Sequence, residues 1–413
     1  MTAGMPMRIR AARAIAECRR IAAMSEVPEQ TTRRYLTPPV RDVHALLQAR
    51  MGSLGIKAHP DAAGNLRGLW RSQKSHGKRL VLGSHIDTVP NAGAFDGVLG
   101  VTVALEWLEL AQQIELPLDI ELIAFSEEEG MRFGTPFLGS RAVAGLFEPA
   151  LLALTDRDGA TLEEAIRAFG LDPGRIGEAL LDDNAIGFVE VHIEQGPVLE
   201  AEGLSVAAVT SIAGQTRFAF KFIGHANHAG TTPMHLRRDA LTAAAEWIGA
   251  VEALALRTDG LVATVGRLDL EPNAGNVIAG SVRVGFEVRS AQDTLRRNAA
   301  ETLLQQAQAI ARRRHLEWQH IPQMDQPAVP MDEALTAYLA EAIEAAGLPP
   351  KRMPSGAGHD AMVMAARVPA AMLFLRSPGG VSHHPAETVL EQDVEAALSV
   401  GRKFLERLAA EVG

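Results

Sequence analysis

The sequence has a single cysteine, Cys18, among its 413 residues. An internal disulfide is therefore excluded, and the composition is typical of a protein from a reducing compartment. Positive charge is not in excess either, since 50 acidic residues outnumber 40 Lys and Arg and give a net charge of −10. A broad basic surface is not expected, so neither nucleic acid nor an anionic membrane is expected as a partner.

Long hydrophobic runs are also missing. No apolar stretch approaches the length of a transmembrane helix, and the N-terminal residues lack the apolar segment of a secretory signal peptide. With 47% hydrophobic residues the chain can still bury a full core, and 413 residues leave room for two domains. We therefore expect a soluble protein of the cytoplasm.

The most informative segment is LVLGSHIDTVPNAGAFDGVLG, residues 80–100. Its apolar start indicates a buried strand, after which His85, Asp87 and Asp96 follow on the loop. In an open α/β sheet, ligands bind beyond the carboxyl ends of the strands. His85 and Asp96 would suit a metal ion, with Asp87 fixing the tautomer of His85 through a hydrogen bond. Taken alone, the segment fits a structural histidine beside a turn aspartate equally well.

Two further strand ends carry residues of the same types. The apolar run 120–125 leads into Glu127, Glu128 and Glu129, and the run 186–192 ends in His192. A charge run more often marks a solvated helix face, but this one directly follows a buried strand. Adjacent carboxylates can divide two tasks, one binding a metal ion and the other taking a proton from water.

A fourth cluster follows a buried strand at 371–375, where GGVSHHP contains His383 and His384. Chemistry alone does not choose between these two imidazoles. The combined candidates offer imidazole and carboxylate but no thiolate, which suits Zn²⁺, Mn²⁺ or Co²⁺; they are His85, Asp96, Glu129, His192 and one of His383 or His384. Five ligands exceed the needs of one tetrahedral site, so we expect a carboxylate that bridges two metal ions.

The order of the expected elements divides the chain into two folds. Strands alternate with helices up to about Ser211, as in a mixed sheet covered by helices. From 212 to 326 the order is strand, helix, strand, strand, helix, strand, which is the ferredoxin-like pattern. The prediction is an α/β/α catalytic domain of residues 1–211 and 327–413, with an inserted α+β domain at 212–326.

Seven segments together resemble one family: GSHIDTVPNAGAFDG, FSEEEGMRF, EVHIEQGP, HANHAGTTPM, NAGNVIAG, SGAGHDA and GGVSHHP. They look like the amidase branch of the dinuclear metallo-aminoacylase and carboxypeptidase superfamily, over nearly the whole chain and in the same order. That branch contains allantoate amidohydrolases, N-carbamoyl-L-amino-acid hydrolases, β-ureidopropionases and ureidoglycolate amidohydrolases. The segments AFSEEEGMRFGTPFLGS, SIAGQTRF and MLFLRSPGGVSHHPAE are most similar to allantoate amidohydrolases.

The resemblance implies a role for each matching residue. One metal ion would be held by His85, Asp96 and His192. The other would be held by Asp96, Glu129 and His383, with Asp96 bridging. Glu128 would be the general base and Asp87 would orient His85. Two positions depart from the family pattern: His384 stands where Ser or Asn is common, and Glu287 stands where Asp is usual. The motif register favours His383 over His384 as the ligand.

The inserted domain would act as a lid that closes over the site and forms a homodimer. Through that dimer, His228 would polarise the scissile carbonyl in the partner's site. Asn276 and Arg289 are implied to bind the substrate carboxylate, with further contacts from Gln195, Gln215 and Gly358.

The implied reaction is metal-dependent hydrolysis of a ureido carbon–nitrogen bond. Allantoate, an intermediate of purine catabolism, would give ureidoglycine, ammonia and carbon dioxide. The alternative substrates are N-carbamoyl-L-amino acids or another ureido acid, such as 3-ureidopropionate or ureidoglycolate, and a peptidase or N-acyl deacylase ranks below them. A binding protein that has lost its chemistry would lack the base or a ligand, and the sequence lacks neither.

Overall fold

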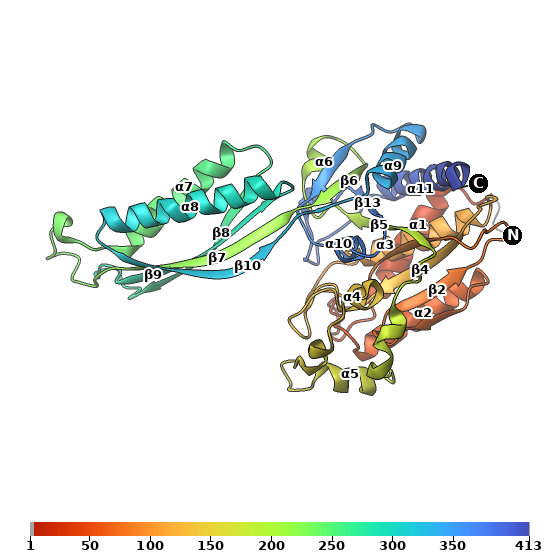
Figure 1. Cartoon of the computed structure of the whole chain (residues 1–413), viewed down its shortest axis with the longest axis horizontal. Coiled ribbons are helices and arrows are strands. Elements are labelled where there is room, and N and C mark those ends of the chain that lie inside the picture. The colour runs from red at the N-terminus through yellow and green to blue at the C-terminus, as the bar shows by residue number, and fades with distance from the viewer. Residues whose placement is uncertain (1–3, 413) are drawn as a thin grey trace. The chain divides into compact units, whose positions relative to one another are not determined.

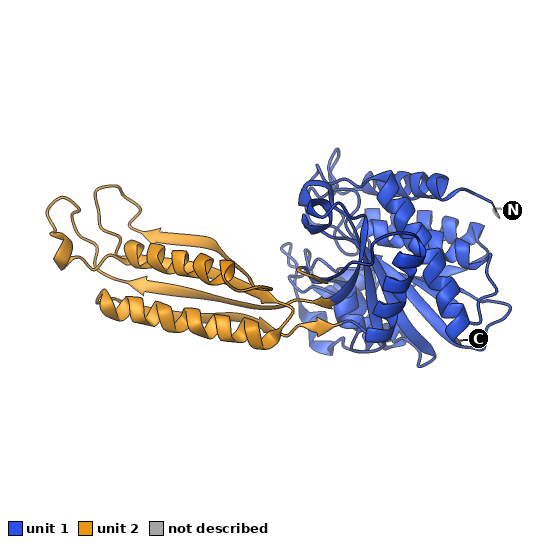
Figure 2. Ribbon diagram, turned by 90° about the horizontal axis from the view of Figure 1, so that it is seen from above, with its two compact units in different colours: residues 1–210, 331–353, 357–413 blue, residues 211–330, 354–356 orange. Residues whose placement is uncertain are grey.

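The computed structural model describes residues 4–412, which divide into two compact units (Figure 2). Unit 1 holds the described residues up to Thr210 together with Met331–Met353 and those from Ala357 onward, and unit 2 holds Ser211–Pro330 and Pro354–Gly356. The inserted segment was expected at 212–326. Each unit has its own hydrophobic core. None of the helices among the described residues combines the length and apolar character that crossing a bilayer requires.

Unit 1 is built on a mixed sheet with strand order β1-β2-β4-β3-β5-β13-β6, and the short strands β11 and β12 pair with β6. The bounds are β1 Ala58–Pro60, β2 Leu66–Trp70, β3 Arg79–His85, β4 Asp119–Phe125, β5 Ala185–Ile193, β6 Val206–Ile212, β11 Val329–Pro330, β12 Arg352–Ser355 and β13 Ala370–Leu375. Strands β4, β3, β5 and β13 run parallel, and β3, β4 and β13 are buried along their whole length. Their near-continuous apolar sequences are typical of parallel strands covered on both faces.

Helices pack on this sheet (Figure 1). Helix α11 contacts α1, α3 and α9, helix α1 also contacts α3, and α10 packs on β5 and β13. The bounds are α1 Met7–Ala22, α2 Pro38–Ser53, α3 Val98–Ala111, α4 Leu138–Ala144, α5 Leu162–Ala168, α6 Val198–Ala201, α9 Glu333–Ala345, α10 Asp360–Met364 and α11 Glu391–Val412, with 3₁₀ turns η1 Pro149–Ala153, η2 Pro173–Ala179 and η4 Pro378–Gly380. The α/β fold agrees with the prediction.

Helix α3 is buried along its whole length and begins directly after the loop with Asp96. A side chain at Gly100 would place Cβ 2.1 Å from the carbonyl oxygen of Val191, so glycine is what lets α3 lie this close to β5. The two buried glutamates of α3, Glu106 and Glu109, pair with arginines of α1 and α2, namely Arg10, Arg13 and Arg50. These contacts hold the C-terminal half of α3 against α1 and α2.

Unit 2 has the expected order of strand, helix, strand, strand, helix, strand. Its elements are β7 Gly214–Ile223, α7 Ala240–Leu256, β8 Val262–Glu271, β9 Ser281–Ser290, α8 Asp293–Arg313 and β10 Glu317–Gln326, with a 3₁₀ turn η3 at Met234–Leu236. The sheet order is β10-β7-β9-β8, with every pair antiparallel. Buried and partly buried residues alternate along β9, so α7 and α8 cover one face of the sheet and the other face stays open.

Three strands of the structure were not predicted from the sequence, namely β6, the two-residue β11 and β12. Strand β6 contains adjacent alanines, Ala207 and Ala208, which favour strands only weakly. Strand β12 contains Pro354, which removes a backbone donor and argues against a strand. Strand β9 begins at Ser281, after a turn at residues 275–276 and an isolated bridge between Val277 and His228.

Candidate metal centre and active site

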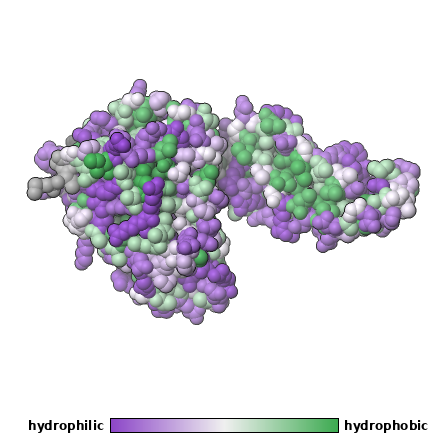
Figure 3. Space-filling model, turned by 180° about the vertical axis from the view of Figure 1, so that it is seen from behind, coloured by the Kyte–Doolittle hydropathy of each residue, from purple (hydrophilic) through white to green (hydrophobic). Residues whose placement is uncertain are grey.

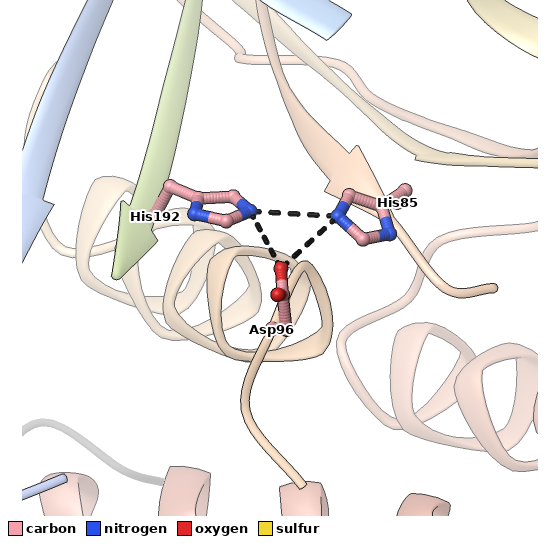
Figure 4. Close-up of side chains that lie close together, drawn as sticks. All are labelled: His85, Asp96 and His192. Carbon is pink, nitrogen blue, oxygen red and sulfur yellow. Dashed lines mark hydrogen bonds and ion pairs between the residues drawn. The ribbon is translucent and has the colours of Figure 1, made fainter. Parts of the chain in front are cut away.

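Three candidate ligands meet at one edge of the unit 1 sheet. His85 ends β3, His192 lies at the end of β5, and Asp96 stands before α3 (Figure 4). Because β3 and β5 are parallel neighbours, their carboxyl ends lie at the same edge. Oδ1 of Asp96 lies 3.5 Å from Nε2 of His85 and 3.2 Å from Nε2 of His192. All three side chains are buried.

The backbone orients both imidazoles toward Asp96. Nδ1 of His85 bonds to the carbonyl oxygen of Asp87 at 3.0 Å, and Nδ1 of His192 bonds to that of Ile193 at 2.9 Å. A carbonyl oxygen only accepts, so each Nδ1 carries the proton and each Nε2 presents a lone pair. The two Nε2 atoms lie 3.4 Å apart, beside an Asp96 Oδ1 that receives no hydrogen bond from the described residues. Three lone-pair donors thus converge, which fits a bound cation.

Asp96 also belongs to a second group, with Glu129 and His383. Nε2 of His383 lies 3.2 Å from Oδ2 of Asp96 and 3.4 Å from Oε1 of Glu129. The two oxygens of Asp96 therefore face different groups, as a carboxylate that bridges two metal ions requires. His384 is placed differently, since its Nδ1 accepts a hydrogen bond from the backbone N–H of Ala386.

The glutamate run after β4 lies inside the protein. Glu127 is 0% exposed and Glu128 is 7% exposed. Burial raises the pKa of Glu128 well above its usual range. Burial and the Asp87 carboxylate raise the pKa of Glu127 to about 8, and burial and Asp96 raise that of Glu129 to about 7. So many buried carboxylates at one place favour a nearby positive charge.

The pKa of His85 also indicates that positive charge is favoured at this site. Burial opposes protonation of this imidazole, yet Glu128, Asp96 and Asp87 outweigh it and raise its pKa well above the usual range. At His383, the hydrogen bond with Asp96 raises the pKa to about 9. Without a bound cation, protons on the imidazoles would supply the missing positive charge.

The Asp87 carboxylate makes a different contact from the predicted one. We expected it to accept a hydrogen bond from the ring of His85, but its Oδ1 lies 3.8 Å from Nδ1, and the backbone carbonyl takes that role. The carboxylate oxygens accept hydrogen bonds from the backbone N–H groups of Glu128 and Glu129, both at 3.1 Å. Because β3 and β4 are parallel neighbours, the loops after them meet. Asp87 thus positions the expected base and one expected ligand.

Arg33 and Glu387 are among the buried charged residues near the site that were not predicted from the sequence. Arg33 is 0% exposed and donates to the carbonyl oxygens of Ile86, Ile21 and Met24. It holds the chain next to Asp87. Glu387 lies behind Asp96 and accepts its backbone N–H. No sequence pattern distinguishes such residues from the many exposed arginines and glutamates.

The residues expected to contact substrate in unit 1 lie as follows. Gln195 has a φ of 58° and donates from Nε2 to Oδ2 of Asp96 at 2.8 Å. It is therefore part of the ligand cluster. Gly358 lies against an aromatic ring, since a Cβ there would come within 3.1 Å of Cζ of Phe137.

The expected substrate residues of unit 2 form two pairs. His228 is exposed on the loop before α7, and the N–H of the next residue, Ala229, donates to the carbonyl oxygen of Asn276 at 2.9 Å. Gln215 and Arg289 are directly opposite each other on β7 and β9. Arg289 donates to Oε1 of Glu287 and to the carbonyl oxygen of Gly356, both at 2.5 Å.

These two pairs lie at opposite ends of the sheet of unit 2. The loop with His228 is bonded to the turn just before β9, through Gly224 and Gly280, whereas Arg289 is near the end of β9. Eight residue steps separate Ser281 from Arg289, which is about 27 Å along an antiparallel strand. Asn276, which precedes the start of β9, and Arg289, near its end, were expected to share the substrate carboxylate; the structure places them toward opposite ends of this strand.

Comparison with known proteins identifies the family to which the chain belongs. Residues 81–407 match the family described as peptidase family M20/M25/M40. An N-carbamoyl-L-amino acid amidohydrolase from Geobacillus stearothermophilus is 37% identical over 92% of this chain and 95% of its own length. An allantoate amidohydrolase from Escherichia coli K12 is 35% identical over 92% of this chain and 93% of its own. A solved amidase of the hydantoinase/carbamoylase family from Burkholderia multivorans has a TM-score of 0.90 at 30% identity, covering 97% of this chain and 98% of that one.

The fold and the named relatives together define a hydrolase that acts on carbon–nitrogen bonds. The chain belongs to peptidase family M20/M25/M40. The resemblance drawn from the seven sequence segments is thereby confirmed. Enzymes of this family depend on metal ions, and the described residues include four His/Asp/Glu groups able to hold one.

Proposed function

We propose that the protein hydrolyses a ureido carbon–nitrogen bond and that its substrate is allantoate. The observation that carries the proposal is the convergence of two ligand groups that share Asp96, beside the buried carboxyl of Glu128. Relatives named for allantoate and for N-carbamoyl-L-amino acids, which are both ureido compounds, support the type of bond. The expected products from allantoate are ureidoglycine, ammonia and carbon dioxide.

The donor set fits two divalent ions, Mn²⁺, Zn²⁺ or Co²⁺. In this proposal one ion is held by His85, Asp96 and His192, and the other by Asp96, Glu129 and His383. When bound, such ions acidify water and polarise a carbonyl oxygen. His384 is left out because its Nδ1 is engaged with the backbone of its own turn.

Glu128 is the proposed general base. Oε2 of Glu128 lies 4.0 Å from Nε2 of His85, at the edge of the ligand cluster. Burial raises its pKa, so the carboxyl can take a proton from the attacking water and keep it until it protonates the leaving nitrogen. The Asp87 carboxylate holds the backbone of Glu128 in place during this transfer.

Arg289 is the proposed partner of the substrate carboxylate. A guanidinium group can donate two parallel hydrogen bonds to a carboxylate, which a lysine cannot. Glu287 and the carbonyl oxygen of Gly356 fix the guanidinium in one orientation. Gln215 lies opposite on β7 and adds a polar group beside it. We propose further substrate contacts from Gln195 and Gly358.

His228 and Asn276 are proposed to serve the site of a second copy of the chain. The distance of about 27 Å along β9 is longer than a small ureido acid, so these two residues and Arg289 of the same chain cannot bind one substrate molecule. In a two-fold dimer, each unit 2 could offer one end to its own site and the other end to its partner's. His228 would then polarise the scissile carbonyl or stabilise its oxyanion.

A surface of unit 2 supports the homodimer. The outward side of α7 is apolar, with exposed Leu241, Ala245, Gly249, Ala253 and Leu256, and the adjoining edge strand β8 exposes Val262 and Leu268. A space-filling view shows hydrophobic residues gathered on unit 2 (Figure 3). Exposed apolar patches mark interaction surfaces, and an edge strand offers unpaired backbone groups to a partner. A copy docked here would cover both.

A location in the cytoplasm is also part of the proposal. Cys18 is buried and unpaired. A chain whose sequence has this one cysteine suits a reducing compartment.

The proposal is tested by a substrate panel with ammonia release as the readout. The panel contains allantoate, N-carbamoyl-L-amino acids, 3-ureidopropionate and ureidoglycolate, and Glu128→Gln serves as the inactive control. We expect the highest kcat/KM with allantoate. A higher value with an N-carbamoyl-L-amino acid would assign the enzyme to that substrate, and no ammonia from any of them would exclude ureido hydrolysis.

A further inference from the structure

Glu387 joins two loops of the candidate metal centre that are far apart in the sequence. It is 6% exposed and lies on the loop that follows His383. Its Oε1 accepts hydrogen bonds from the backbone N–H groups of Phe95 and Asp96, at 2.8 and 3.0 Å. The side chain thereby connects the loop of the shared carboxylate to the loop of His383.

Ser382 adds a second connection between the same loops. Its Oγ donates to Oδ2 of Asp96 at 2.6 Å and lies 3.3 Å from Oε2 of Glu387. Asp96 is therefore held at its backbone by Glu387 and at its carboxylate by Ser382. Both contacts come from one short segment, so a shift of that segment would move Asp96 and His383 together.

The packing around Glu387 leaves no room for a side chain on the opposite loop. A Cβ on Gly93 would lie 2.3 Å from Cβ and 2.4 Å from Oε1 of Glu387. Real Cβ atoms do not approach other atoms this closely, so any larger residue at position 93 would displace Glu387.

We propose that Glu387 is a positioning residue for the metal centre, which fixes the backbone of Asp96 relative to His383 so that one carboxylate can serve both ligand groups. The inference rests on the proposed two-ion site. Residues that orient metal ligands through hydrogen bonds alter metal affinity by about 10- to 100-fold when they are removed. Glu387 itself need not touch an ion or the substrate.

The first test measures Mn²⁺ binding to metal-free protein by calorimetry, with thermal unfolding of the same metal-free samples. Glu387→Ala should weaken Mn²⁺ binding by about 10- to 100-fold. Glu387→Gln should bind nearly as tightly as wild type, because its amide oxygen can accept the same two N–H groups. In Glu387→Asp the side chain is one methylene shorter, so this variant should bind Mn²⁺ as weakly as Glu387→Ala. Glu391→Ala is the matched control, because Glu391 is an exposed glutamate paired with Arg8.

The second test uses Gly93. The variant Gly93→Ala should weaken Mn²⁺ binding as Glu387→Ala does, because its Cβ would collide with the side chain of Glu387. Adding Gly93→Ala to Glu387→Gly should cause no further loss, since glycine at position 387 removes both the Cβ and the carboxylate from that space. A folded Glu387→Ala that binds Mn²⁺ as tightly as wild type, or a Glu387→Gln as weak as the Ala variant, would overturn the inference. Absence of Mn²⁺ binding by the wild type would instead refute the proposed function.

Discussion

Oδ1 of Asp87 accepts a hydrogen bond from the backbone N–H of Glu128 at 3.1 Å. The ring of His85 is held separately, by the backbone carbonyl of Asp87. A substitution of the Asp87 side chain therefore removes the first contact and leaves the second. This separation allows the role of the carboxylate to be measured.

We predict that Asp87→Asn lowers kcat by about 10- to 100-fold with little loss of bound metal. An asparagine has one carboxamide oxygen, so one of the two backbone N–H groups would face an amide nitrogen and Glu128 would shift. Steady-state kinetics and elemental analysis of the same sample provide the check. If the variant instead loses metal and excess Mn²⁺ restores kcat, the carboxylate acts through a metal ligand, either His85 or Glu129, and not through Glu128.

Substitution by glutamine should have a different effect at each of the three glutamates after β4. Glu128→Gln should keep its metal and lose most turnover, because the base is gone. Glu129→Gln should bind one ion more weakly. Glu127→Gln should cost little, because the raised pKa of Glu127 keeps its carboxyl largely neutral and glutamine can still accept the N–H groups of Arg132 and Phe133. If Glu127→Gln lost more turnover than the other two variants, the base and the ligand would be assigned one residue out of register.

Arg289→Lys should raise KM for a carboxylate-bearing substrate by at least about tenfold, since the charge stays but the two parallel hydrogen bonds are lost. The matched control is Arg283→Lys, on the same side of the same strand. The control should leave KM unchanged. Equal KM values for Arg289→Lys and wild type, with the best substrate of the panel, would remove Arg289 from the site.

Exchange of His228 between subunits can be tested by mixing two inactive variants. Glu128→Ala and His228→Ala are dissociated together and reassociated. In a mixed dimer, one site combines an intact Glu128 with an intact His228 from the other chain. Random pairing at equal amounts should return roughly a quarter of wild-type activity for a two-fold dimer. If His228 acts within its own chain, every site carries a lesion and no activity returns.

Much of the site was predictable because its ligands stand at the ends of buried strands. The segments with His85 and His192 end apolar runs, and the sheet order makes those runs parallel neighbours. Periodicity and length also predicted the six elements of unit 2 in order. These are local features, and a single sequence displays them directly.

What could not be predicted depends on contacts between segments distant in the sequence. Glu387 meets Asp96 only after β13 has been placed beside β5. Arg33 becomes a buried donor only when its loop packs beside β3. The carboxylate of Asp87 was expected to bond to the ring of His85. It bonds instead to backbone N–H groups of the loop after β4, because β4 lies beside β3. The separation of Asn276 from Arg289 follows from the length of β9.

The central claim is that this chain hydrolyses a ureido bond with the help of two bound metal ions. It is tested most directly by removing metal with a chelator, confirming its absence by elemental analysis, and following ammonia release from allantoate while Mn²⁺ is added back. His383→Ala should bind less metal than wild type, and His384→Ala should bind as much. We expect no ammonia without metal and activity that rises until two ions are bound per chain; full activity in the metal-free protein would contradict a metal-dependent reaction.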